Sequence, residues 1–344
     1  MKYFLILMLV INVIVIVFCS QNNEKKENTV DHELGFSTGI NIGEKIPEFS
    51  LLDQNGNRKE LKEMIGKNGA ILNFYRSASW WPYCKKELVE FQEKQNEFHK
   101  KGISIIGISY DSVNILKSFS NKYQITYPLL ADINSEVIKQ FGILNTTIDS
   151  DSKIFGIPYP GLFIIDRDMT VIKKQFEKSY AARPSVENIL VTHFNKELDS
   201  NIHYFKNSYL TGSIAISDTL AFPAQILALV VKVSMKEDFH LYGNPIPKGY
   251  IPLTIELDTN SNFTFDKFQF PKTKKIKLQL LEETFHILPN EMVLTSHINI
   301  IKRPQIGSDT VKIKVKFQAC DANICMPPTD LKFQFPITIT KSIN

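Results

Sequence analysis

The chain has 344 residues, more than one ordinary domain needs and enough for two of average size. Hydrophobic residues make up 43% and charged residues 22%, which excludes a wholly disordered or fibrous protein. The 40 Lys and Arg against 36 Asp and Glu give a net charge of +4, too small over this length for a nucleic-acid-binding footprint. The four cysteines exclude a small disulfide-rich scaffold and leave few positions for thiol chemistry.

The first segment of the chain, residues 1–19, has the pattern of an export signal. Lys2 precedes an apolar run from Tyr3 to Phe18, which Asn12 alone interrupts. This pattern is typical of a signal peptide, and the run is just short of a comfortable membrane span. We therefore expect an exported protein, in the periplasm or the cell envelope, where disulfides can persist.

Cys19 ends this segment at the place where a bacterial lipoprotein signal carries the cysteine that becomes lipidated. The segment resembles such a signal but differs from it at Phe18, where a small residue is usual. We favour lipidation of Cys19, with an uncleaved membrane anchor and plain secretion as the alternatives. Residues 20–41 are polar and charged, and we interpret them as a tether.

Short apolar runs alternate with helical patterns from about residue 42 to residue 198. Strands that alternate with helices indicate an α/β layered domain over this range. The strands are predicted at residues 46–52, 70–75, 103–109, 162–165 and 171–176. The helices are predicted at residues 82–100, 113–119, 135–141 and 186–194, the first with Pro82 in its first turn.

Four segments of this domain resemble, in their order and spacing, the AhpC/TSA (peroxiredoxin-like) branch of the thioredoxin superfamily. They read IPEFSLLDQNGN, NFYRSASWWPYCKKELVEFQ, ISIIGISYD and PYPGLFIIDRD. The resemblance implies a thioredoxin-like fold in which the turn from strand to helix carries two cysteines separated by two residues. The first cysteine is a nucleophilic thiolate at the helix N-terminus, and the second resolves the mixed disulfide.

This chain departs from that pattern at Trp81, which stands where the nucleophilic cysteine is expected. Cys84 remains at the resolving position and is either a structural core thiol or a working redox partner. Pro160 matches the cis-proline of the thioredoxin fold. Peroxiredoxins carry a peroxide-binding arginine near that point, and neither Tyr159 nor Gly161 supplies one.

After about residue 201 the sequence becomes rich in β-branched and aromatic residues. Strands are predicted at residues 225–233, 251–257, 263–270, 292–301 and 311–317, and the last alternates strictly between apolar and polar side chains. Several strands separated by Pro, Gly and Asn favour an all-β sandwich over residues 202–344.

The last predicted strand leads into Cys320 and Cys325, which four residues separate and which Pro327 and Pro328 follow. This spacing allows a small disulfide loop, which is either structural or exchanging. A zinc site is a poor interpretation because the two sulfurs lack a second pair of ligands. We expect no metal and no cofactor.

Three segments of this region resemble the N-terminal domain of the thiol:disulfide interchange protein DsbD: FHLYG, GYIP and FQACDANICMPP. The resemblance implies an immunoglobulin-like sandwich whose cysteine pair accepts electrons from a membrane partner and passes them to thioredoxin-like proteins. It makes Cys320 and Cys325 the exchanging pair, with residues 239–242 near it. His240 is interpreted as a packed strand-end residue rather than a catalytic base.

The sequence leaves two main classes of function open. The first is an exported thiol–disulfide oxidoreductase that uses the Cys320–Cys325 pair and exchanges with a thioredoxin-like or membrane protein. The second is a scaffold or binding module whose thioredoxin-like domain has lost catalysis. A one-cysteine peroxidase at Cys84 is a narrower third alternative. Exchange requires an attackable disulfide and peroxidase chemistry requires a thiolate, so the accessibility of the sulfurs separates these functions.

Overall fold

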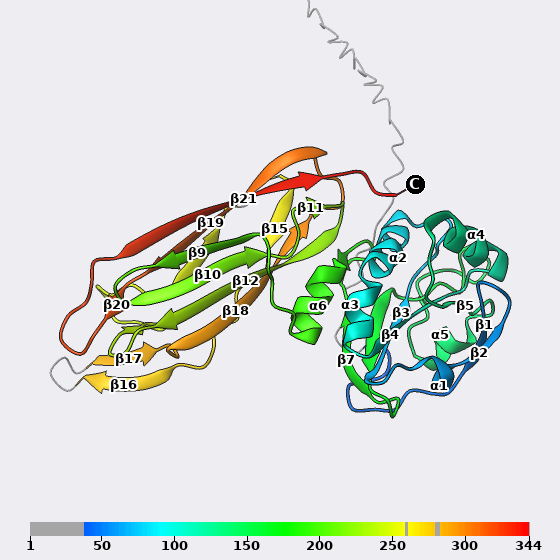
Figure 1. Cartoon of the computed structure of the whole chain (residues 1–344), viewed down its shortest axis with the longest axis horizontal. Helices are drawn as coiled ribbons and strands as arrows, with labels where there is room; N and C mark the ends of the chain where they lie inside the picture. Colours follow the sequence, from blue (N-terminus) through cyan, green and yellow to red (C-terminus); the bar gives the residue numbers. More distant parts are fainter. Residues whose placement is uncertain (1–37, 259–260, 279–282, 344) are drawn as a thin grey trace, which may run out of the picture. The chain divides into compact units, whose positions relative to one another are not determined.

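The computed structural model describes residues 38–258, 261–278 and 283–343. Residues 1–19, with Cys19, and most of the tether lie outside the described residues, so the expectations for them stay predictions. Figure 1 shows helices and strands over residues 50–194, here called the α/β domain, and strands over residues 202–339, here called the β-sandwich. No helix in the described part of the chain is long and apolar enough to cross a membrane.

One seven-stranded sheet forms the centre of the α/β domain. Its central strands β3 (Gly69–Phe74), β4 (Ile103–Ser109) and β5 (Leu129–Ala131) run parallel, and β6 (Gly161–Ile165) returns antiparallel to β3. In spatial order the strands are β2 (Arg58–Glu60), β1 (Ser50–Asp53), β5 (Leu129–Ala131), β4 (Ile103–Ser109), β3 (Gly69–Phe74), β6 (Gly161–Ile165) and β7 (Val171–Phe176).

Helices cover both faces of this sheet, because successive residues of the buried strands point to opposite sides. Ile71 of β3 joins one apolar cluster and Leu72 joins the other. The first cluster is covered by α2 (Pro82–Glu93), α3 (Gln95–Lys100), α4 (Val113–Tyr123) and α6 (Val186–Phe194), and the second by α1 (Leu61–Met64) and α5 (Glu136–Gln140). This is the thioredoxin-like α/β fold that the sequence predicts.

The structure corrects the prediction of one long helix over residues 82–100. The backbone leaves the helical region at Lys94 (φ −101°, ψ 4°), so α2 ends at Glu93 and α3 begins at Gln95. The helical periodicity of the sequence continues across this break, which is why the pattern alone does not show it.

The structure also corrects the prediction of a cis-proline at Pro160. Among the described residues the cis peptide bond is the one before Pro245, and the bond before Pro160 is trans. The amide of Tyr159 donates a hydrogen bond to the carbonyl of Ile143 at 2.7 Å. This hydrogen bond and a bridge between Leu144 and Pro158 hold the chain beside residues 143–144 as it approaches β6.

Two sheets form the β-sandwich, and the side chains between them make one apolar core. The first sheet consists, in spatial order, of β15 (Phe263–Phe265), β18 (Glu291–Ile300), β12 (Gln225–Met235), β10 (Leu210–Ile216) and β9 (Ile202–Lys206). The second consists of β11 (Leu220–Ala221), β21 (Thr329–Ile339), β19 (Gly307–Phe317) and β14 (Thr254–Leu257). β18 and β21 alternate between buried and exposed residues, as strands do when one face packs on a core and the other meets water. The predicted immunoglobulin-like sandwich is confirmed as a fold class.

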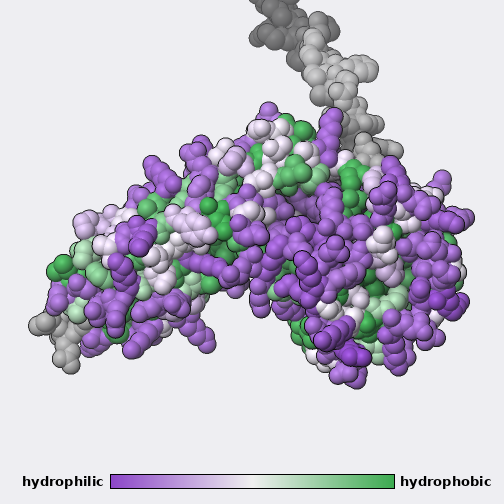
Figure 2. Space-filling model, in the orientation of Figure 1, coloured by the Kyte–Doolittle hydropathy of each residue, from purple (hydrophilic) through white to green (hydrophobic). Residues whose placement is uncertain are grey.

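Two short ribbons and one bridging pair complete the fold. β13 (His240–Leu241) pairs with β20 (Ala319–Cys320), and β16 (Lys274–Leu278) pairs with β17 (Glu283–Ile287). A bridge between Tyr242 and Ile287 joins the two ribbons. β8 (Arg183–Pro184) pairs in parallel with the start of β12. In the view of Figure 2 the surface is mostly hydrophilic, with hydrophobic side chains in small separate patches.

Glu90 of α2 is a buried carboxylate with a perturbed pKa. Its Oε1 accepts a hydrogen bond from Gln225 at 2.7 Å and lies 3.5 Å from the ammonium of Lys86. Burial disfavours the charged form and raises the pKa of Glu90 from its ordinary value of 4.5 to about 7, although Lys86 opposes the shift. The folded protein therefore retains a proton on Glu90 that the unfolded chain loses at lower pH.

The free energy of unfolding is accordingly expected to fall as the pH rises from about 4.5 to about 7. The loss has an upper bound of roughly 3 kcal/mol, from 1.36 kcal/mol for each pKa unit. Glu90→Gln removes this loss, so the variant gains about 1–3 kcal/mol over the wild type at pH 8 and little at pH 4.5. Urea unfolding at both pH values measures it. Glu93→Gln, exposed on the same helix, is the control, and an equal gain at both pH values contradicts the assignment.

Candidate functional site

The described residues contain two sulfur sites, one in each of the two folds. Cys84 of the α/β domain is a free, buried thiol. Cys320 and Cys325 of the β-sandwich are joined in a disulfide. No group of three or more His, Cys, Asp or Glu side chains in the described part of the chain could hold a metal ion.

Cys84 lies in the first turn of α2, directly after the turn that leaves β3. Pro82 is the first residue of the helix, where its missing N–H leaves no helical hydrogen bond unmade. Trp81 is the N-cap residue. Asp111 fixes the preceding turn, because its carboxylate accepts hydrogen bonds from the Ser77 hydroxyl (2.8 Å) and the Ala78 amide (2.7 Å).

The sulfur of Cys84 accepts two hydrogen bonds inside the protein. The backbone N–H of Arg76 and the Nη2 of Arg183 each lie 3.3 Å from Sγ. The Nε of Arg183 lies 3.4 Å from a carboxylate oxygen of Glu87, which is one helical turn further along α2. All three side chains are buried, so they form a thiol–guanidinium–carboxylate cluster.

Burial sets the protonation of this cluster. It raises the pKa of Cys84, an effect that Arg183 opposes and Glu87 reinforces. It also raises the pKa of Glu87, again against the effect of Arg183. Burial disfavours the charged form of Arg183, yet the thiol and Glu87 hold its pKa above the ordinary value. The resting thiol is therefore protonated beside a fixed cation that would stabilise its thiolate.

Trp81 belongs to an aromatic group around the guanidinium of Arg76. The guanidinium carbon lies 4.2 Å from the ring centroid of Trp81, 5.5 Å from that of Trp80 and 5.3 Å from that of Tyr180. Cations over aromatic faces are attracted by the ring quadrupole. Trp81, which stands where the nucleophilic cysteine is expected, thus packs against the guanidinium of Arg76 at the N-terminus of α2.

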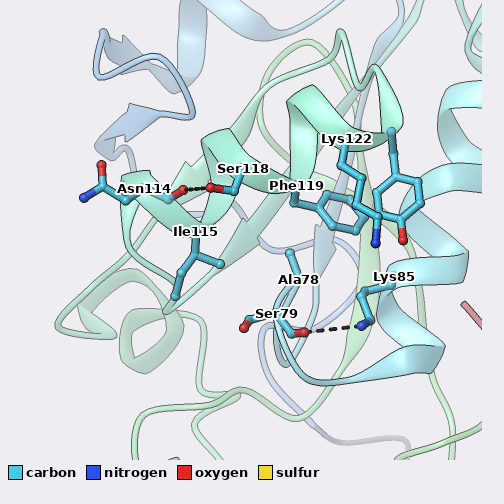
Figure 3. Close-up of a pocket in the computed structure, with 9 residues that line it drawn as sticks. Ala78, Ser79, Lys85, Asn114, Ile115, Ser118, Phe119 and Lys122 are labelled. Atoms are coloured by element: carbon cyan, nitrogen blue, oxygen red, sulfur yellow. Dashed lines mark hydrogen bonds between the residues drawn. The ribbon is translucent and has the colours of Figure 1, made fainter. Parts of the chain in front are cut away.

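An open cavity of about 370 Å³ lies between the start of α2 and α4 (Figure 3). The ammonium of Lys85 donates a hydrogen bond to the Ser79 carbonyl at 3.3 Å on one side of it. Ile115, Phe119 and Lys122 of α4 line the other side. Cys84 is not one of its lining residues, so the cavity does not give direct access to the thiol.

Cys320 ends β20, and Cys325 follows a four-residue loop. The two sulfurs are 2.02 Å apart and the Cα atoms 4.0 Å apart. Within the loop Asp321 accepts hydrogen bonds from the amides of Asn323 (2.7 Å) and Ile324 (2.8 Å), which lower the pKa of its carboxyl group. These hydrogen bonds give the disulfide loop a defined conformation.

The two bonded cysteines differ in exposure. Cys320 is 1% exposed, whereas Cys325 is classed with the exposed residues. Ile324, next to Cys325, is 59% exposed. The Cys325 half of the disulfide therefore lies at the surface, and the Cys320 half lies in the interior.

Aromatic side chains surround the buried half of the disulfide. Cys320 belongs to a cluster with Tyr242 and Phe285, whose ring centroids are 5.1 Å apart. The ring of Tyr250 packs edge to face on Phe285 at 4.8 Å. In the β13–β20 ribbon His240 lies directly opposite Cys320. Of residues 239–242, His240 and Tyr242 thus lie beside the disulfide, as the resemblance implies, whereas Phe239 and Leu241 pack on the main core of the sandwich.

Sequence analysis does not find every member of these sites. Glu87 lies one helical turn after Cys84, so the helix pattern could have brought it to notice. Arg183 is 99 residues from Cys84 along the chain, and no local pattern links them. Phe285 is also remote from Cys320 in the sequence and meets it only through the packing of the ribbons.

Comparisons with known proteins agree with both folds. The family model described as AhpC/TSA matches residues 42–174. The model described as the N-terminal region of the thiol:disulfide interchange protein DsbD matches residues 213–336. The first range contains Cys84 but not Arg183, and the second contains both Cys320 and Cys325.

Related proteins match the α/β domain. Thiol-disulfide oxidoreductase ResA from Bacillus thuringiensis is 32% identical over 136 residues, which are 39% of this chain and 69% of ResA. The putative peroxiredoxin bcp from Coxiella burnetii is 34% identical over 133 residues, 38% of this chain and 83% of that protein. The crystal structure of peroxidoxin BcpB from Mycobacterium tuberculosis is similar with 27% identity and a TM-score of 0.40, over 46% of this chain and 99% of that one. This chain therefore belongs to the AhpC/TSA family of the thioredoxin superfamily, and its residues 213–336 match the model of the DsbD N-terminal region.

Proposed function

We propose that this protein is an exported thiol–disulfide oxidoreductase whose exchanging group is the Cys320–Cys325 disulfide. The observation that carries the proposal is the asymmetry of this pair, in which an exposed Cys325 is bonded to a buried Cys320. A disulfide that only stabilises a fold gains nothing from exposing one sulfur, whereas exchange requires it.

The exchange proceeds in two displacements. A thiolate of a thioredoxin-like partner attacks Sγ of Cys325, the S–S bond breaks, and its electron pair passes to Sγ of Cys320. The second thiolate of the partner then attacks the partner's own sulfur in the mixed disulfide and releases Cys325. The partner's dithiol is oxidised to a disulfide, and the Cys320–Cys325 pair is reduced to two thiols. The reverse sequence transfers electrons in the other direction.

The α/β domain supplies a different kind of sulfur site. Its described part holds one cysteine, Cys84, so it cannot form an internal disulfide of its own. In this proposal it docks a partner or acts as a redox client of the β-sandwich. The main alternative is a scaffold in which both sulfur sites are structural.

A peroxidase at Cys84 is a second candidate, and one observation favours it. The guanidinium of Arg183 donates to Sγ at 3.3 Å, although it comes from a different place in the sequence than the arginine that peroxiredoxins carry near Pro160. A Cys84 thiolate would attack one peroxide oxygen, form a sulfenic acid and release the other oxygen as water or an alcohol. Burial of the thiol, which raises its pKa, places this candidate second.

Membrane attachment through a lipid on Cys19 is part of the proposal. It is supported by the export-signal pattern of residues 1–19 and by the position of Cys19 at its end. Mass spectrometry of the native N-terminus should show a first residue Cys19 with a diacylglycerol group or a further acyl chain. A mature protein that begins at another residue with an unmodified N-terminus contradicts lipidation and leaves the exchange chemistry unaffected.

The exchange assignment predicts the effect of removing either sulfur of the pair. Cys325→Ser and Cys320→Ser should each abolish turnover with a reduced thioredoxin-like protein, measured as loss of the partner's thiols. Cys84→Ser, the matched control, should retain activity within about twofold, because it removes a buried thiol outside the exchanging pair. In glutathione buffers the wild-type pair should titrate above about −300 mV, the range of exchanging disulfides. A lower potential with no turnover supports the scaffold instead.

The peroxidase candidate predicts a slow reaction of Cys84 with hydrogen peroxide at pH 7. Each unit by which the thiol pKa exceeds the pH lowers the thiolate fraction about tenfold, so the rate should rise with pH. Arg183→Gln removes the cation and should slow the reaction about tenfold further, whereas Arg183→Lys should restore part of the rate. Stopped-flow kinetics with mass detection of sulfenic acid measure these rates. Rapid, stoichiometric sulfenic acid at Cys84 in the wild type would make peroxidase the better assignment.

A further inference from the structure

His240 is a titratable side chain next to the exchanging pair that the proposed function does not use. In the β13–β20 ribbon it is the direct cross-strand partner of Cys320, while Leu241 pairs with Ala319. Residues directly opposite in an antiparallel ribbon project to the same face, with Cβ atoms about 4.5–5.5 Å apart. The side chains of His240 and Cys320 therefore lie next to each other on the same face of the ribbon.

The ring of His240 has an unsatisfied nitrogen. Its Nε2 is buried and finds no hydrogen-bond partner among the described residues while the disulfide is formed. The ring packs edge to face on Tyr242, with centroids 5.0 Å apart. A buried polar atom without a partner is destabilising, so a nitrogen of this kind points to a partner that another state of the site provides.

The ring is neutral at physiological pH. Burial lowers the pKa of His240, and the carboxylate of Asp321, in the loop after β20, opposes the shift. The other titratable side chain against the ring is Tyr242, whose pKa burial raises, so it also stays neutral. A neutral imidazole carries one N–H donor. The carboxylate of Asp321 already accepts hydrogen bonds from the loop amides of Asn323 and Ile324.

We propose that His240 is a catalytic residue that donates a hydrogen bond from Nε2–H to the thiolate of Cys320 when the disulfide opens. This inference rests on the proposed exchange at Cys320–Cys325. The thiolate of a thioredoxin-like partner bonds to Cys325, the S–S bond breaks, and the electron pair goes to Cys320. The hydrogen bond stabilises that charge, and Cys320 afterwards takes a proton from solvent.

Burial of Cys320 makes such a donor necessary. A thiolate in an apolar cluster is disfavoured, and a leaving thiol with a raised pKa departs slowly. Tyr242 and Phe285 offer apolar surface on the other sides of this sulfur. Asp321 would repel the charge. The orphaned nitrogen of His240 thus matches the one new acceptor that the reaction creates.

The test compares variants of the full chain with dithiothreitol as the attacking thiol. His240→Phe keeps a planar ring and removes the donor, and we expect the rate of opening of the disulfide to fall about tenfold, since hydrogen bonds to charged groups are worth about this factor. His240→Gln keeps an N–H donor and should stay within about threefold of the wild type. His286→Phe is the matched control, because His286 follows Phe285 on β17 and so points away from the cluster of Cys320.

The pH dependence of the equilibrium separates catalysis from packing. We expect the equilibrium constant for reduction by glutathione to be up to about tenfold lower in His240→Phe than in the wild type at pH 9, and equal in the two proteins at pH 6. The constant is measured from the disulfide fraction of the peptide that contains Cys320 and Cys325. The difference appears only where Cys320 ionises. A shift of the same size at every pH indicates packing alone and overturns the inference.

The outcomes distinguish this inference from the proposed function. If dithiothreitol opens the wild-type disulfide and His240→Phe behaves identically in rate and pH profile, the role of His240 is wrong and the exchange assignment stands. If dithiothreitol does not open the wild-type disulfide under native conditions, the exchange itself is wrong and the inference fails with it. Should His240→Phe not fold, His240→Leu serves as a second variant without a donor and is judged by the same two measurements.

Discussion

Burial of sulfur is the constraint on which both sites of this protein depend. Water would solvate a thiolate, and a protein that removes water must replace it with a fixed polar group or leave the sulfur protonated. Cys84 lies buried in the first turn of α2 with the guanidinium of Arg183 against it. Cys320 lies in an aromatic cluster with the imidazole of His240 across the ribbon. A buried cysteine sulfur thus lies beside a cation at one site and beside a neutral imidazole at the other.

The backbone pairing decides which polar group meets each sulfur. Arg183 reaches Cys84 because the two residues of β8 pair with the first two residues of β12, which fixes the segment between β7 and α6. His240 reaches Cys320 because two residues of β13 pair with two of β20. Both arrangements depend on very short ladders. A shift of either register by one residue would turn the side chain to the opposite face and remove it from its sulfur.

How far the sequence predicts these features depends on whether the signal is local. The strand at 103–109 and the helix at 186–194 are predicted in full, because periodicity and end signals lie within each segment. β21 escapes prediction because Pro336 interrupts its pattern; on its outer side that strand pairs only at Thr338 and Ile339 within the described residues, so the proline is tolerated. Arg183 and His240 come from segments that are distant in the sequence from their cysteines, so no rule of residue spacing predicts these contacts.

The four-residue loop between the two cysteines sets the order of events in the proposed exchange. If a partner bonds at Cys325, as proposed, the displaced sulfur of Cys320 stays close to the new bond, because the two Cα atoms are 4.0 Å apart in the closed pair. That sulfur is the nearest nucleophile to the intermediate and competes with every other thiol at a very high effective concentration. A partner with one cysteine is therefore displaced again by Cys320 unless a second thiol is supplied at high concentration, whereas a partner with two cysteines completes the proposed exchange and is released oxidised. The short loop thereby favours partners with two thiols over partners with one.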